Sequence, residues 1–135
     1  MPAKDLMHAN FNSESIIASH LKVAEAAGVI IASPVYKTTF TGVIKAYIDL
    51  LPEKGFKDKI IAVYFVGGTI SNLLSIDYAV KPILASMGAK YFAENVFAVD
   101  SQIERSEDSE GNMIFQIAEE LKQRIQNSVN DLIDY

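Results

Sequence analysis

The chain has 135 residues, of which 50% are hydrophobic and 21% are charged, and this composition is typical of one globular domain with a moderate core. The net charge of −5, with no run of lysines or arginines, argues against a nucleic-acid partner. The absence of cysteine excludes disulfides and thiolate metal sites, and no apolar run reaches membrane-spanning length. We therefore expect a cytoplasmic protein with no membrane partner.

The first half of the chain predicts a helix, a strand and a second helix. Residues 13–27 carry apolar side chains at helical spacing, and Gly28 closes this helix. Residues 28–33, GVIIAS, are uniformly apolar, which is typical of a parallel strand buried on both faces. Apolar side chains recur at helical spacing over residues 43–51, so a second helix is expected there.

A second strand and a third helix follow. The run KIIAVYFVGG indicates another buried strand that ends at a pair of glycines, Gly67 and Gly68. Residues 74–87 predict a helix that contains Pro82. Because proline removes a backbone donor and clashes with the preceding turn, we expect an irregular turn within this helix.

The last third of the chain predicts one more strand and one more helix. Residues 90–99 indicate the third strand, and the acidic run ERSEDSEG is expected to be a solvated loop. Apolar residues at helical spacing predict a final helix over residues 112–133. Helices that alternate with strands indicate an α/β fold, with a parallel sheet joined by right-handed crossovers. Three strands and four helices are expected in a single domain over residues 1–135.

Two strand-to-helix junctions, residues 33–36 and residues 66–69, carry unusual residues and form the candidate site. Both come at the carboxyl ends of neighbouring strands, where open α/β sheets bind ligands, so we expect them to line one crevice. Glycine lets the main chain approach a ligand closely, free amides can bind ring nitrogens and carbonyl oxygens, and tyrosine can flank a planar group. The crevice would therefore suit an aromatic heterocycle with polar edges. The alternative is that both loops are ordinary turns. The candidate residues are Pro34, Val35, Tyr36, Gly67, Gly68 and Thr69.

The other residues capable of chemistry form no constellation. His8 and His20 are isolated and lack metal-ligand spacing. The carboxylates of Asp49, Asp77 and Asp100 are far apart in the sequence, with no sign of pairing between them. We therefore predict no catalytic side chain and no metal site, and a hydrolase or metalloenzyme has little support.

Three stretches together resemble a known family. They are ASPVYKTTFTGVIKAYIDLLPEKGFKDKIIAVYFVGGT, SIDYAVKPILASMGAK and FAVDSQI. They resemble the NADPH-dependent FMN reductases of the flavodoxin-like superfamily, and within it the subgroup that supplies reduced flavin to sulfonate-degrading monooxygenases. The resemblance covers about residues 2–105, and the final helix matches only in pattern.

The resemblance implies a flavodoxin-like, doubly wound parallel sheet with FMN at its switch point. Residues 34–36 would lie beside the flavin ring, and residues 67–69 would lie at its other edge. NADPH would be the donor, and hydride would pass from nicotinamide C4 to flavin N5, so the cofactors carry the chemistry. A flavin-dependent monooxygenase is the implied partner, and a homo-oligomer is expected, with the irregular helix around Tyr78 and Pro82 as a candidate surface.

The chain departs from the family pattern in one respect. Family members begin with a strand, a phosphate-binding loop, a helix and a second strand, and none of these is recognisable here. We expect the sequence to be an N-terminally truncated version of the domain, with an open edge on the strand at 28–33 and weak FMN binding of its own. Two alternatives stay open: a related quinone or azo-dye reductase that retains its FMN, and an inactive fragment that acts only through association.

Overall fold

A computed structural model describes all of residues 1–135. None of its helices has the length and apolar character needed to cross a membrane. Besides two single 3-10 turns, at Ile70–Asn72 and Asp100–Gln102, the chain forms helices, one π-helical turn and strands. In chain order these are α1 (Ala3–Met7), α2 (Glu14–Glu25), β1 (Gly28–Pro34), α3 (Gly42–Ile48), β2 (Ile60–Gly67), the π-helical turn η2 (Ile76–Val80), α4 (Lys81–Ser86), β3 (Tyr91–Phe92), β4 (Val96–Val99), β5 (Ile103–Glu107), β6 (Met113–Ile117) and α5 (Glu119–Asp134).

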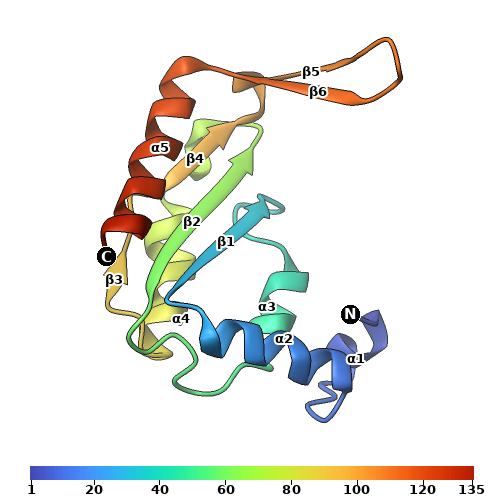
Figure 1. The fold of residues 1–135 in the computed structure, drawn as a ribbon, viewed down its shortest axis with the longest axis vertical. Helices are drawn as coiled ribbons and strands as arrows, with labels where there is room; N and C mark the ends of the chain where they lie inside the picture. The colour runs from blue at the N-terminus through green and yellow to red at the C-terminus, as the bar shows by residue number, and fades with distance from the viewer.

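The main sheet is parallel and is built around β2. Strand β1 pairs with one edge of β2 along its whole length, from Gly28 opposite Ile60 to Pro34 opposite Val66. The other edge of β2 pairs first with β3 and then with β4, both in parallel. This arrangement confirms the predicted α/β fold class with parallel strands (Figure 1).

Helices cover the sheet on two sides, as a doubly wound fold requires. The larger core lies on the side of α3, η2 and α4 and contains Ile31 of β1 together with Val63 and Phe65 of β2. On the other side, α5 packs on β2 and β4 through Leu121, with Leu132 beside Ile60. The alternate side chains of β2 therefore point into two different cores.

The prediction that β1 is buried on both faces is wrong. Ile31 and Ser33 are buried, but Ile30 is 52% exposed and Ala32 is also exposed. Helix α5 packs against β4 and β2, and only its end reaches β1, where a side chain added at Gly28 would meet Leu132. Because β1 lies at the edge of the sheet, one of its faces and its outer edge are open, which confirms the expected open edge.

The predicted third strand is divided into two pieces. Strands β3 and β4 both pair with β2, but residues 93–95 separate them. The Ala93 amide still donates to the Ile61 carbonyl, at 2.9 Å, whereas the next amide, that of Glu94, donates to the Asp131 carboxylate of α5, at 2.8 Å. Between the two pieces β2 advances by three residues, from Ile61 to Tyr64, whereas its partner advances by four, from Phe92 to Val96, so one extra residue interrupts the ladder.

The predicted acidic loop is instead an antiparallel hairpin of β5 and β6, which projects from the body of the molecule (Figure 1). The Asp108 carboxylate accepts hydrogen bonds from the amides of Glu110 and Asn112, and Gly111 has a φ of +81°. These are the interactions that stabilise a tight turn. The predicted final helix is consequently too long, because residues 113–117 form β6 and α5 begins at Glu119.

The predicted irregularity near Pro82 is confirmed. Residues Ile76–Val80 form a π-helical turn, and Pro82 lies in the first turn of α4, where a proline needs no backbone donor. The sequence did not predict α1, so the structure has five α-helices where four were expected. The divided third strand and the hairpin give six strands where three were expected.

Candidate functional site

The two predicted loops meet at the carboxyl ends of β1 and β2. The Val35 amide donates to the Val66 carbonyl, at 2.7 Å, so the pairing of the strands continues into the first loop. A cavity of about 740 Å³ opens at this end of the sheet. Its lining includes five of the six predicted residues, namely Pro34, Val35, Tyr36, Gly67 and Gly68, but not Thr69.

The loop after β1 is fixed by its own hydrogen bonds. The Ser33 hydroxyl donates to the Pro34 carbonyl, at 2.8 Å, and accepts from the Thr41 amide, at 3.1 Å. The Tyr36 amide donates to the Thr39 carbonyl, at 2.8 Å, and this closes a turn in which Lys37 has a positive φ of 49°. Tyr36 itself is 66% exposed, so a rigid turn presents its ring at the edge of the cavity.

The loop after β2 offers backbone donors and open space. A Cβ added at Gly67 would lie 3.0 Å from Cζ of Phe97 and 3.4 Å from Cβ of Val35, whereas a Cβ at Gly68 would meet no atom within 4 Å. The amides of Gly68 and Thr69 donate to no group in the protein. The Thr69 hydroxyl instead accepts from the Ser71 amide, at 3.3 Å, and caps the short 3-10 turn.

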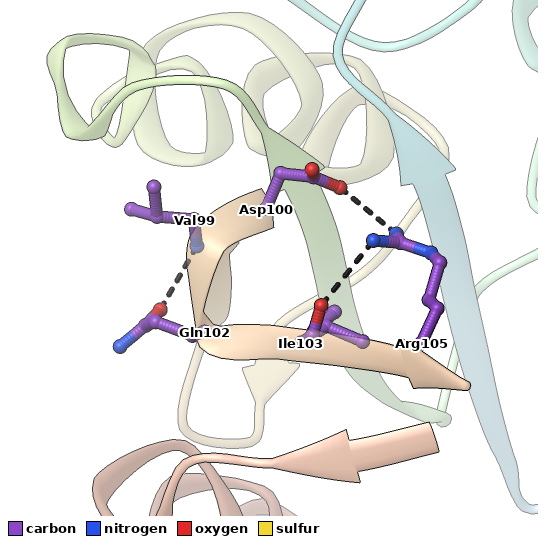
Figure 2. Close-up of polar contacts among 5 residues, drawn as sticks. All are labelled: Val99, Asp100, Gln102, Ile103 and Arg105. Atoms are coloured by element: carbon purple, nitrogen blue, oxygen red, sulfur yellow. Dashed lines mark hydrogen bonds and ion pairs between the residues drawn. The ribbon is translucent and has the colours of Figure 1, made fainter. Parts of the chain in front are cut away.

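The base of the hairpin supplies a wall that the sequence analysis missed. Ile103 and Arg105 of β5, with Phe115 and Ile117 of β6, line the same cavity. Figure 2 shows the Arg105 side chain reaching back from β5 toward Asp100, at the end of β4. The alternation of Met113, Phe115 and Ile117 is the signal for a strand, but Ile114 and Ile117 also fit the spacing of the helix that follows.

The lining residues favour binding over acid, base or nucleophilic chemistry. No histidine, cysteine or lysine lines the cavity, and its two charged residues, Asp100 and Arg105, pair with each other at 2.8 Å. No group of three or more histidine or carboxylate side chains is placed to hold a metal ion.

A flavin ring fits these donors. The ring of FMN is planar and has polar edges, and the cavity presents an exposed tyrosine together with the unpaired amide and open space of Gly68, which the unpaired amide of Thr69 follows in the chain. The hydroxyl of Tyr64, another lining residue, is buried without a hydrogen-bond partner in the protein. Polar groups of this kind require partners, and a polar-edged ligand can supply them.

A second cavity, of about 600 Å³, has a different character. It lies along the open edge of β1 between α2 and α3, and 13 of its 14 lining residues are hydrophobic. Ser19 is the exception, and its hydroxyl lies 2.9 Å from that of Tyr47. This cavity offers almost no polar group to orient a ligand, so it is the weaker candidate for a cofactor site.

Comparison with known proteins agrees with this geometry. Residues 1–104 match the family described as NADPH-dependent FMN reductase. The chain is 38% identical over 128 residues to an FMN reductase (NADPH) of Pseudomonas putida, which covers 95% of this chain and 64% of the relative. It is 39% identical over 100 residues to an FMN reductase (NADPH) of Escherichia coli, which covers 74% of this chain and 52% of the relative.

The fold has a close counterpart among solved structures. The apo form of the NADH:FMN oxidoreductase EmoB superposes with a TM-score of 0.81, at 24% identity, over 99% of this chain and 67% of that one. The chain spans between about half and two thirds of the length of the curated relatives described above.

Proposed function

Because the chain belongs to the NADPH-dependent FMN reductase family, we propose that it takes part in the reduction of FMN by NADPH. The observation that carries the proposal is the cavity in which residues 34–36 meet Gly67 and Gly68, with two unpaired amides beside it. NADPH is the proposed donor because the relatives from Pseudomonas putida and Escherichia coli both bear NADPH in their names.

In this proposal the two loops hold the flavin ring from two sides. Tyr36 flanks the ring, and the open backbone at Gly68 lets the amides of Gly68 and Thr69 donate to its polar edge. The bound FMN would accept a hydride from nicotinamide C4 at its N5. The side chains of this protein position the ring and need not supply a nucleophile or a strong base.

The openness of the cavity supports a flavin that exchanges with solvent. Tyr36 is 66% exposed, and a side chain at Gly68 would meet no neighbour. A flavin bound there can leave after reduction, so we propose delivery of reduced FMN to a partner flavin-dependent monooxygenase. The cytoplasmic location expected from the sequence stays a prediction.

We also propose that the π-helical turn contributes to a homo-oligomer. Tyr78 of this turn is 78% exposed, and the extra residue in a π turn presents side chains away from the regular helical stripe. Light scattering tests this proposal, because Tyr78→Ala should shift the mass toward the monomer. A wild-type chain that is monomeric at working concentration would contradict it.

The function is tested by mixing the chain with NADPH and FMN without oxygen and following loss of the visible absorbance of the flavin. Reduction should require the protein, and it should be faster with NADPH than with NADH. Parallel assays with a quinone and an azo dye, each with catalytic FMN, test the alternative acceptors. Failure to bind FMN together with failure to oxidise NADPH would contradict the proposal.

A further inference from the structure

Arg105 is the only positively charged residue that lines the flavin cavity. It lies on β5, at the base of the hairpin, outside the residues 1–104 that match the family. The chain as a whole carries a net charge of −5, so its overall charge does not attract an anionic ligand. The same cavity contains Tyr36 and the two glycines of the proposed ring site, which makes Arg105 a neighbour of any nucleotide bound there.

The guanidinium is held in place but keeps free donors (Figure 2). Nη2 donates to the Asp100 carboxylate, at 2.8 Å, and Nη1 donates to the Ile103 carbonyl, at 3.3 Å. An arginine side chain has five N–H groups, so three stay available for other oxygen atoms. The side chain is 44% exposed, and these donors can therefore reach a ligand.

The hairpin base that carries Arg105 is itself anchored to the sheet. The Gln102 side chain accepts from the Val99 amide, at 2.9 Å, and its backbone carbonyl accepts from the Ala118 amide, also at 2.9 Å. These two bonds join the end of β4, the start of β5 and the start of α5. The position of Arg105 relative to the cavity is therefore fixed by the fold, although the tip of the hairpin projects away.

We propose that Arg105 binds a phosphate group of the nucleotide in this cavity, a role that rests on the proposed function. Arginine forms charge-assisted hydrogen bonds with phosphate, and its planar group can make two at once. The neighbouring carboxylate of Asp100 orients the guanidinium and neutralises part of its charge, so the expected contribution is moderate. The phosphate belongs either to FMN or to NADPH, and binding measurements separate these two sources.

The first measurement compares FMN with riboflavin, which has the same ring but no phosphate. Arg105→Gln should weaken FMN binding about tenfold, close to 1.4 kcal/mol, and leave riboflavin binding unchanged. Arg124→Gln is the matched control, because it removes the other arginine of the chain, which lies on α5 outside the cavity. Flavin fluorescence quenching gives both affinities, and circular dichroism verifies that each variant is folded.

The second measurement uses NADP⁺ in place of the flavin. A loss of NADP⁺ affinity in Arg105→Gln, with both flavins unaffected, would assign the residue to a phosphate of the dinucleotide and also support the proposal. Equal losses for FMN and riboflavin, or no loss for any ligand, would overturn it. If the wild-type chain binds neither flavin nor NADP⁺, the proposed function fails first, and this outcome is visible without any variant.

Discussion

Strands β1 and β2 look alike in sequence but occupy different environments. Both are short apolar runs, and the two pair with each other in full register. Ile61 and Ala62 of β2 are both 0% exposed. Ile30 of β1, which lies opposite Ala62, is 52% exposed. The difference arises because β2 has a strand on each edge and helices on both faces, while β1 has one strand neighbour and one covered face.

The candidate site therefore has one wall on the central strand, β2, and one on the edge strand, β1. The loop after β2 is attached to the central strand, and Gly67 is packed against Phe97 and Val35. The loop after β1 is attached to the edge strand, and it keeps its shape through its own turn and through the bond from Val35 to Val66. The stability of the fold should therefore depend mainly on β2, whereas ligand access depends on the side of β1.

The largest expected effect comes from truncating the same residue type in each strand. Ile61→Ala should lower the free energy of unfolding by about 2–5 kcal/mol, because it leaves a cavity in the central strand. Ile30→Ala, at an exposed position of β1, should lower it by less than about 1 kcal/mol. Urea denaturation measures both, and equal losses would mean that the outer face of β1 is covered in solution.

The two glycines at the end of β2, Gly67 and Gly68, give an intermediate effect that separates packing from binding. Gly67→Ala should destabilise the fold by about 1–3 kcal/mol, because the new methyl group would overpack against the Phe97 ring. Gly68→Val should leave the unfolding midpoint unchanged but weaken flavin binding, since its side chain would fill the space beside the unpaired amides. Denaturation and flavin titration of both variants test this, and unchanged flavin affinity in Gly68→Val would contradict the site assignment.

The order of the main elements was predictable from local patterns. Apolar runs and their glycine or proline boundaries located β1, β2, α2 and α3 to within a few residues, and Pro82 indicated the π-helical turn. The loops at Tyr36 and Gly68 were also predictable, because the carboxyl ends of neighbouring parallel strands share one edge of the sheet.

The remaining features depend on contacts that a linear pattern does not contain. The exposure of Ile30 follows from which neighbours the edge strand lacks, and the break between β3 and β4 follows from one extra residue relative to β2. The hairpin was hidden because Ile114 and Ile117 extend the helical spacing of α5 toward the N-terminus. Arg105 was therefore placed in a loop, and its position beside the cavity became visible only with the strand pairing.

The smallest expected effect is a pH dependence of the folding stability that comes from the ion pair of Asp77 and Lys81. Asp77 of the π turn accepts hydrogen bonds from Lys81, at 3.0 Å, and from Asn95, at 3.2 Å. The Lys81 hydrogen bond is the main reason why the pKa of Asp77 lies below its usual value of 3.8, and partial burial opposes it. A depressed pKa contributes stability that is present above the unfolded value and is lost as the pH falls through the folded one.

Asp77→Asn should therefore reduce stability by less than about 1 kcal/mol near neutral pH, since the pair is partly exposed. The difference from the wild type should shrink as the pH falls below about 4. Urea midpoints across this range measure the effect, and Lys81→Gln should flatten the acid dependence in the same way. A difference that stays constant with pH would show that the pair contributes nothing through ionisation.

The central claim is that the flavin ring lies at the carboxyl ends of β1 and β2, and backbone amide NMR tests it most directly. Riboflavin is titrated into the ¹⁵N-labelled chain, because it carries the ring without the phosphate. The amides of Gly68 and Thr69, which have no partner in the protein, should show the largest shifts, together with those around Tyr36. Val23 and Val43, in the apolar cavity along β1, should be unaffected. Shifts centred on Val23 and Val43, with none at residues 68 and 69, would contradict the account.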